Sequence, residues 1–102
     1  MGRASYAIRL LRVAEDDLTE IVLYIAADRP SGATKIADRI EQKLKLLPDN
    51  PHLGSVPTDD SLALLGYRYL VADNYLIFYV IEDQTIYVHR IVHGARDYTQ
   101  LL

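Results

Sequence analysis

The sequence contains no cysteine, so disulfides, thiolate zinc sites and cysteine nucleophiles are excluded. It also lacks a long hydrophobic run, because the longest one, YLIFYVI, is far shorter than the roughly 20 residues that span a bilayer. Arg9 and Arg12 interrupt the only apolar stretch near the N-terminus, and we therefore expect no signal peptide. Together these absences predict a cytoplasmic protein without a membrane segment.

The motifs of several enzyme classes are also absent. There is no Walker loop, no dinucleotide-binding glycine fingerprint and no G-x-S-x-G elbow, so nucleotide hydrolysis and serine hydrolysis have no support. His89 and His93 have a spacing that binds metal on a helix, but they fall on a predicted strand, where four residues span about 13 Å. Two ligands of one zinc ion cannot lie that far apart. We expect neither a metal nor a cofactor.

Positive charge is scarce and unevenly placed. The net charge of −3 argues against broad, non-specific binding to nucleic acid, which depends on clustered Lys and Arg. All three lysines fall between positions 35 and 45, whereas the later half of the chain has arginines in place of lysines: Arg68, Arg90 and Arg96. Arginine presents a planar donor fork that suits carboxylates and specific partners. The sequence therefore places a few isolated positive points in an acidic molecule.

The beginning of the chain predicts one strand and one helix. Apolar and polar residues alternate over 5–11, which indicates a half-buried strand. Residues 14–29 change to helical spacing, with one apolar face. The acidic residues 15–17 then fall in the first helical turn, where the helix dipole favours anions.

A second helix follows after a short connection. Pro30 ends the first helix, because the residue before a proline avoids the helical region. Ser31 is the expected N-cap of the second helix, which continues to about Leu47. Two amphipathic helices with so short a connection should pack as an antiparallel hairpin, with the apolar stripe against the sheet and the lysines mostly in water.

Polar residues and prolines predict a loop over 48–61, and three strand-like runs follow it, at 66–72, 75–82 and 85–93. The breaks between these runs are short and polar, so the strands should form an antiparallel meander. The complete prediction is an α+β fold in one domain, residues 1–102, with an N-terminal strand, an antiparallel helical hairpin and a three-strand meander. The first strand could join either edge of the meander.

Tyrosine dominates the aromatic residues, with eight tyrosines, one phenylalanine and no tryptophan. Tyr69, Tyr75 and Tyr79 lie in the meander, where they could pack in the core while their hydroxyls reach the edge of the sheet. A sheet rich in tyrosine and arginine would also suit stacking against nucleic acid or contact with a protein. The core interpretation is the one we expect.

The segment VHRIVHGARDY, residues 88–98, gathers polar groups around the end of the last strand. His93 could act as an acid–base group if a cleft and a partner were present, or it could hydrogen-bond the end of the strand. The spacing favours the second interpretation. Arg96 and Asp97 could pair with each other or with neighbours, which would contribute about 0.2–1 kcal/mol at an exposed site.

In the order of its elements, the chain resembles the RelE/ParE superfamily of toxins from bacterial type II toxin–antitoxin systems. The resemblance runs nearly end to end and is carried by AEDDLTEIVLYIA in the first helix, LLPDNPHLG after the second, GYRYLVADNYLIFYVI in the central hairpin and VHRIVHGARDY in the last strand and tail. It implies a cognate antitoxin, a small ParD-like or related protein that binds operator DNA and wraps the toxin. The toxin itself would meet that DNA only through the antitoxin.

The superfamily has two branches with different targets. RelE-like members cleave messenger RNA on the ribosome, and the resemblance implies that Arg68, His93 and Tyr98 would be the catalytic residues here. ParE-like members act on DNA gyrase and need no such chemistry. The segment LGSVPTDDSLALLGY lacks the lysine and glutamate that the RNase members tend to carry. The H-x-x-R ending formed by His93 and Arg96 also leans to the ParE-like branch.

The resemblance therefore favours a toxin that inhibits DNA gyrase and is not an enzyme. A ribosome-dependent endoribonuclease is the alternative, and a module that only holds its antitoxin is a third possibility. The residues that we expect to contact the target or the antitoxin all lie in the strands and tail of the later half; they are Arg68, Arg90, His93, Arg96 and Tyr98.

Overall fold

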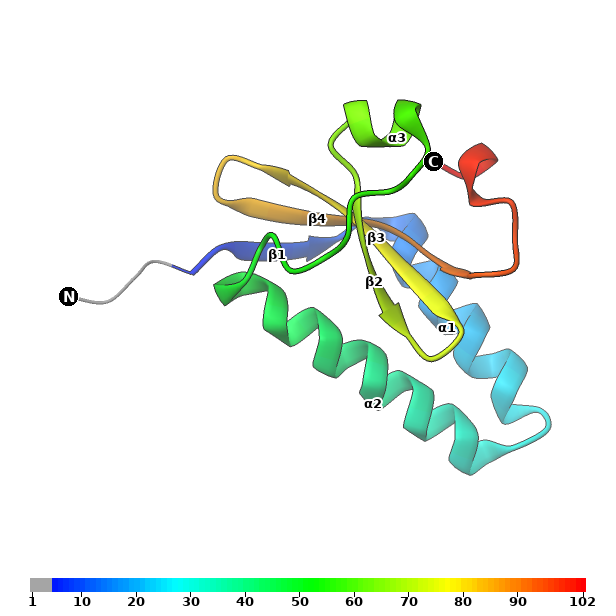
Figure 1. The fold of residues 1–102 in the computed structure, drawn as a ribbon. Coiled ribbons are helices and arrows are strands. Elements are labelled where there is room, and N and C mark those ends of the chain that lie inside the picture. The colour runs from blue at the N-terminus through cyan, green and yellow to red at the C-terminus, as the bar shows by residue number, and fades with distance from the viewer. Residues whose placement is uncertain (1–4) are drawn as a thin grey trace.

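Figure 1 shows a sheet with two long helices across one face. The computed structural model describes residues 5–102. In chain order its helices and strands are β1 (Ala7–Leu10), α1 (Arg12–Ala26), α2 (Pro30–Leu46), α3 (Asp60–Leu64), β2 (Arg68–Ala72), β3 (Tyr75–Glu82) and β4 (Thr85–His93), with 3-10 turns at Leu47–Asp49 and Tyr98–Gln100. The predicted α+β fold is confirmed. Within the described range, no helix combines the length and apolar character that crossing a bilayer would require.

The strand order in the sheet is β1-β4-β3-β2. β2, β3 and β4 form the predicted antiparallel meander. β1 joins the β4 edge and runs parallel to it, with Leu10 opposite Val88 as the last pair. Parallel neighbours need a long crossover, which the helices and the other two strands provide here. The position of the first strand, which the sequence left open, is therefore beside β4.

The helices begin earlier than predicted. α1 begins at Arg12 rather than at Ala14. α2 begins at Pro30, and its N-cap is Arg29, so the predicted N-cap role of Ser31 is wrong. Proline suits the first helical position because its ring fixes a helical φ and its missing N–H would have no intrahelical acceptor there. The prediction that Pro30 ends the first helix is therefore wrong: α1 ends earlier, at Ala26, and Pro30 opens the second helix.

The helical hairpin and the sheet enclose the larger hydrophobic core. Ile40 of α2, Ile77 of β3 and Ile86 of β4 are completely buried between them. Burying a side chain of this size contributes about 1.5–3 kcal/mol. The other buried members of this core are Ala14, Ile36, Leu47, Leu70, Ala72, Tyr79, Val88 and Ile91.

A smaller apolar cluster lies on the opposite face of the sheet, where Phe78 of β3 is completely buried. α3 and the C-terminal segment cover this face, as Figure 1 shows, and the ring centroid of Tyr98 lies 4.9 Å from that of Phe78. The other members are Leu62, Tyr67 and Val92, with Tyr69, Leu76, Val80, Leu101 and Leu102 packed against them. Both faces of the sheet are therefore covered, one by long helices and the other by short segments.

The predicted loop over 48–61 is too long, because its last residues belong to α3. Asp59 is the N-cap of this helix, and its carboxylate accepts a hydrogen bond from Leu62 N at 3.0 Å. An aspartate at this position satisfies one of the backbone donors that a helix leaves free at its start. The signal for α3 was present in the sequence, as Asp59 three residues before the short apolar run 62–65, but the run is too brief to show helical periodicity.

A tyrosine hydroxyl ties the loop after α2 to the sheet. Tyr79 is completely buried, and its hydroxyl donates to Pro51 O and accepts from Gly54 N, both at 2.8 Å. A Cβ at position 54 would lie 2.7 Å from the Tyr79 hydroxyl oxygen and 2.8 Å from Tyr69 O, so glycine is required. The expectation that these tyrosines belong to the cores is confirmed for Tyr79, and Tyr69 and Tyr75 pack against the cores as well.

Replacing Tyr79 with phenylalanine should lower the free energy of unfolding by about 1–3 kcal/mol, because a buried N–H and a half-buried carbonyl of the loop lose their partner. Urea unfolding followed by circular dichroism measures the change. Tyr87→Phe is a matched control, because the half-buried Tyr87 hydroxyl has no hydrogen-bond partner within residues 5–102, and its effect should stay within about 0.5 kcal/mol. Equal losses in the two variants would contradict the tethering role.

Candidate functional site

A buried ion pair connects α1, β4 and the C-terminal segment. The carboxylate of Asp17 accepts hydrogen bonds from Arg90 Nε at 2.7 Å and from Arg90 Nη2 at 2.9 Å, and the two side chains are only 10% and 18% exposed. The hydrogen bond to Asp17 raises the pKa of Arg90. Arg90 Nη1 also donates to Leu101 O at 3.3 Å. Arg90, which we expected to contact a partner, is thus engaged inside the molecule.

Asp17 also completes the outer edge of β4. β1 pairs with β4 only as far as Val88, so the backbone N–H of Ile91 lies beyond the reach of that strand. The Oδ2 atom of Asp17 accepts from Ile91 N at 2.9 Å. Asp17 lies beyond the first turn of α1, where Glu15 is the acidic residue, so its predicted role at the positive end of the helix dipole is wrong. The pairing with β4 explains its position instead.

Arg68, another expected contact residue, holds the loop after α2. Its Nη1 atom donates to Gly54 O at 2.7 Å and to His52 O at 3.2 Å. Ser55 and Tyr69 exchange two backbone hydrogen bonds of 2.9 Å beside this contact. Arg68 therefore holds the loop along the outer edge of β2, because its guanidinium donates hydrogen bonds to two backbone carbonyls of that loop.

His93 hydrogen-bonds the end of β4, as the sequence led us to expect. Its Nδ1 atom accepts from Ala95 N at 3.1 Å, and its ring packs edge-on against Tyr75 with centroids 5.4 Å apart. The side chain is exposed. His93 also lines an open cleft beside the helices.

The remaining two expected residues lie in the tail. Arg96 is exposed and makes no ion pair within residues 5–102. Asp97 accepts from Thr99 N at 3.3 Å and from Thr99 Oγ1 at 2.6 Å, so the anticipated pairing of Arg96 with Asp97 does not form. Tyr98 is half-buried against Phe78. Arg96 is thus the predicted contact residue whose guanidinium is most available to a partner.

The structure does not bring the residues of the expected RNase site together. In the sheet register, Arg68 lies opposite Tyr79 and His93 lies opposite Tyr75, and these positions on β3 are separated by about 13 Å of strand. Opposite residues of an antiparallel pair share a face, so Arg68 and His93 both lie on the helical face. Tyr98 packs on the other face of the sheet.

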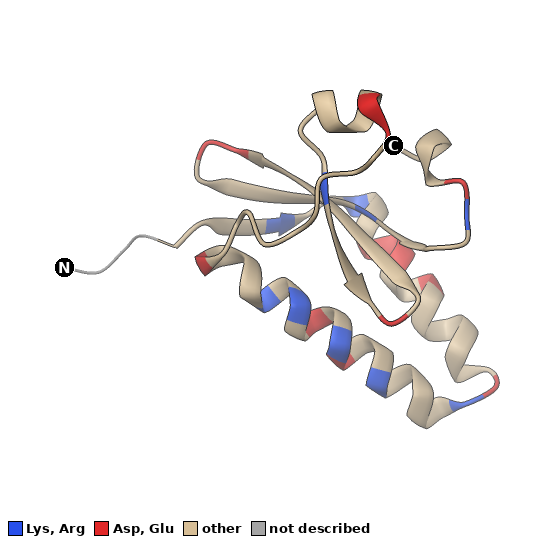
Figure 2. Cartoon of the chain, viewed as in Figure 1, with Lys and Arg blue, Asp and Glu red and all other residues tan. Residues whose placement is uncertain are grey.

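His93 borders the largest cleft of those we describe, a space of about 470 Å³ between the tips of the helical hairpin and of the β2–β3 turn. Figure 2 shows Lys and Arg residues along α2, the helix that lines one side of this cleft. Arg29 and Lys35 line it, as does Arg39, whose Nη1 lies 2.7 and 2.6 Å from the two carboxylate oxygens of Asp73. The three lysines of α2 are exposed, as predicted. The cleft is a locally positive surface on an acidic protein.

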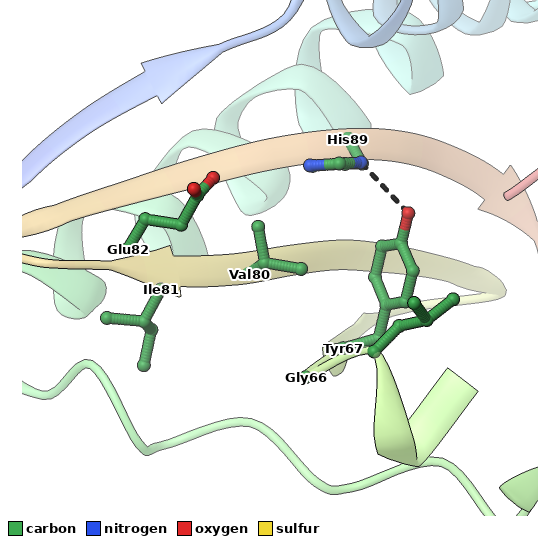
Figure 3. A pocket seen from close by; sticks show the side chains of 7 residues that line it. Gly66, Tyr67, Val80, Ile81, Glu82 and His89 are labelled. Atoms are coloured by element: carbon green, nitrogen blue, oxygen red, sulfur yellow. Dashed lines mark hydrogen bonds between the residues drawn. The ribbon is translucent and has the colours of Figure 1, made fainter. Parts of the chain in front are cut away.

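A second pocket, on the face of the sheet that carries α3, contains a histidine that sequence analysis did not select as a site. It has a volume of about 400 Å³, and Figure 3 shows Tyr67 and His89 joined at its floor, with 3.0 Å between the Tyr67 hydroxyl and His89 Nδ1. Burial lowers the pKa of His89, while the nearby charge of Glu82 opposes this shift. The lining residues are Leu65, Gly66, Tyr67, Val80, Ile81, Glu82 and His89.

A comparison with protein-family models assigns the chain. Residues 8–98 match the model of the ParE toxin of the type II toxin–antitoxin system parDE. The chain belongs to the ParE toxin family. It is therefore a toxin of the RelE/ParE superfamily, and the predicted toxin–antitoxin assignment is confirmed. No curated protein sequence matches this ParE-family chain.

Two solved structures share the fold of this ParE-family toxin. The chromosomal ParDE system from P. aeruginosa contains a chain with a TM-score of 0.73 and 20% identity, and the match covers 87% of this chain and 96% of that chain. The RelBE2 toxin–antitoxin complex from Mycobacterium tuberculosis gives a TM-score of 0.62 and 22% identity, over 87% of this chain and 98% of that chain. At these identities the likeness concerns the fold.

Asp17→Ala should lower the free energy of unfolding by about 3–5 kcal/mol, because it leaves the largely buried charge of Arg90 without its carboxylate and Ile91 N without its acceptor. Asp17→Asn keeps an acceptor and should cost less, which provides a folded variant if the alanine variant does not fold. Asp16→Ala is the control, because it removes only an exposed pair with Arg12 and should change stability by at most about 1 kcal/mol. Urea unfolding measures all three, and a similar loss for Asp16 and Asp17 would refute a special role for the buried pair.

His89 should titrate below its ordinary pKa of 6.5 in the folded toxin, since burial disfavours the charged ring. A pH titration of its ring resonances by NMR measures the midpoint, and the same titration in denaturing urea should return a value of about 6.5. Because the unfolded chain then binds this proton more readily, the related stability is complete above about pH 6.5 and decreases as the pH falls below it. A native midpoint at or above the unfolded value would contradict the burial argument.

Proposed function

We propose that this ParE-family toxin inhibits DNA gyrase by binding it in the cytoplasm, and that a cognate antitoxin neutralises it. The observation that carries the proposal is the arrangement of Arg68, His93 and Tyr98. Acid–base cleavage of RNA requires catalytic groups within hydrogen-bond reach of one ribose and its phosphate. These three side chains lie along about 13 Å of strand and on two faces of the sheet. Their placement supports action by binding over action by cleavage.

The charge distribution supports the same target class. Gripping ribosomal RNA would favour a broad positive face, because affinity for nucleic acid depends on the number of phosphates neutralised. The chain has a net charge of −3, and in Figure 2 the positive residues gather on α2 rather than on the meander. In the meander itself, Arg68 and Arg90 are engaged by internal acceptors. A protein surface is therefore the more suitable target.

Exposed apolar residues support a protein partner that covers part of the surface, as an antitoxin would. Leu23 and Tyr24 at the end of α1 are 64% and 81% exposed, and Leu64 and Leu65 at the end of α3 are 89% and 67% exposed. Adjacent large apolar residues at this exposure are typical of surfaces that contact another protein. We propose that the antitoxin is a small ParD-like or related protein, and that it, not the toxin, binds operator DNA.

The test is a supercoiling assay with purified gyrase and purified toxin. We expect loss of supercoiling with accumulation of cleaved DNA, and no A-site cuts when the same preparation is added to ribosomes that carry a message. Added antitoxin should restore supercoiling. Full supercoiling at excess toxin would refute the gyrase proposal, and A-site cuts would establish the RelE-like endoribonuclease instead.

Arg96→Ala should weaken gyrase inhibition at least about fivefold, because an accessible guanidinium at a protein contact is worth about 1 kcal/mol or more. The concentration for half-inhibition in the supercoiling assay measures this change. Lys43→Ala, another exposed cation but on α2, is the control and should leave inhibition unchanged. If Arg96→Ala and the wild type inhibit equally, Arg96 does not contact the target.

A further inference from the structure

An irregularity in the sheet turns His89 into the pocket on the α3 face. Phe78 lies opposite Arg90, and the next residue, Tyr79, lies opposite Val88, so His89 is an extra residue of β4 without an opposite partner. A β-bulge of this kind re-aims side chains and is common beside functional sites. The bulge thus places an imidazole in the pocket, and His89 is left without a paired residue on β3.

Tyr67 fixes the orientation of the imidazole. Its hydroxyl lies 3.0 Å from Nδ1, and the two rings pack edge-on with centroids 5.2 Å apart. A phenol hydroxyl can accept as well as donate, so it can hold the tautomer that is protonated at Nδ1. In that tautomer Nε2 keeps its lone pair. Figure 3 shows this second nitrogen directed toward the side of the pocket where the carboxylate of Glu82 lies.

The pocket has the charge and the walls that suit a cation on an aliphatic stem. Glu82 brings a negative charge, no Lys or Arg lines the pocket, and the half-buried imidazole favours its neutral form. Leu65, Val80 and Ile81 supply apolar walls. A phosphate would meet the Glu82 carboxylate and no cation, so the pocket disfavours nucleic acid. A metal ion would find two ligands, since residues 5–102 contain no cluster of three suitable side chains.

We propose that this pocket binds the side chain of a lysine or arginine that belongs to a protein partner. The cationic head donates to the Glu82 carboxylate and to His89 Nε2, while its methylene groups lie on Leu65 and Ile81. Leu65, which lines the pocket and is 67% exposed, also offers apolar surface to the partner around that residue. The proposal goes beyond the assignment of gyrase as the target, because it concerns a pocket that the gyrase proposal does not use and holds for any toxin activity.

The experiment uses the isotope-labelled full-length toxin and small probes in place of the partner. N-acetyl-lysine methylamide and N-acetyl-arginine methylamide carry the two candidate side chains, and N-acetyl-norleucine methylamide carries an uncharged aliphatic chain. Titration followed by NMR should show saturable shifts of the His89 ring and of the backbone amides of 80–82 with at least one cationic probe. Comparison of the two cationic probes decides between lysine and arginine.

Two variants make the titration decisive. Glu82→Gln removes the charge of an exposed side chain, and it should weaken binding of the cationic probe about fivefold. Glu15→Gln, an equal change on the exposed side of α1, should have no effect. Equal shifts with the norleucine probe, unchanged binding in Glu82→Gln, or no saturable shift with either cationic probe would each overturn the proposal. None of these outcomes depends on gyrase, so the proposed function can fail or stand independently.

Discussion

The arrangement of the whole molecule depends on one ion pair held away from water. Removing the charges of Asp17 and Arg90 from solvent is costly, and the cost is offset only where geometry is good and further hydrogen bonds satisfy both groups. Here the carboxylate accepts from Arg90 and from Ile91 N, and the guanidinium also reaches Leu101 O. A single contact thus sets α1 against β4 and fastens the segment that covers the opposite face.

Most of the fold could be predicted because strand alternation and helical spacing are local properties of the sequence. The parts that could not be predicted depend on longer-range contacts. Nothing within residues 5–11 distinguishes one edge of the meander from the other, so the parallel pairing of β1 with β4 was open. Ser31 has the chemistry of an N-cap, but Pro30 prevails because its fixed φ suits the first helical position. The capping propensity of one residue does not show which of two adjacent residues determines where the helix begins.

The candidate site was harder to predict, because composition identifies charged residues without identifying their partners. Arg68 and Arg90 were expected to face a target, yet backbone carbonyls engage the first, and a carboxylate 73 positions away engages the second. Arg96 alone of the three arginines has no such internal partner within the described range. His89 was not predicted as a site, because the regular alternation of a strand does not distinguish it from the other residues of β4. The bulge that directs it into the pocket arises only when β3 and β4 pair.

The parallel pairing of β1 with β4 has a consequence for folding of the chain during translation. β4 is the central partner of both β1 and β3, and of these four strands it is synthesised after the other three. Chains that depend on contacts between distant segments fold slowly, because conformational entropy is lost in bringing the segments together before their contacts stabilise the chain. The apolar face of the helical hairpin therefore cannot be fully buried until β4 has been synthesised. Until β4 has been translated, the polypeptide is present but this sheet is incomplete.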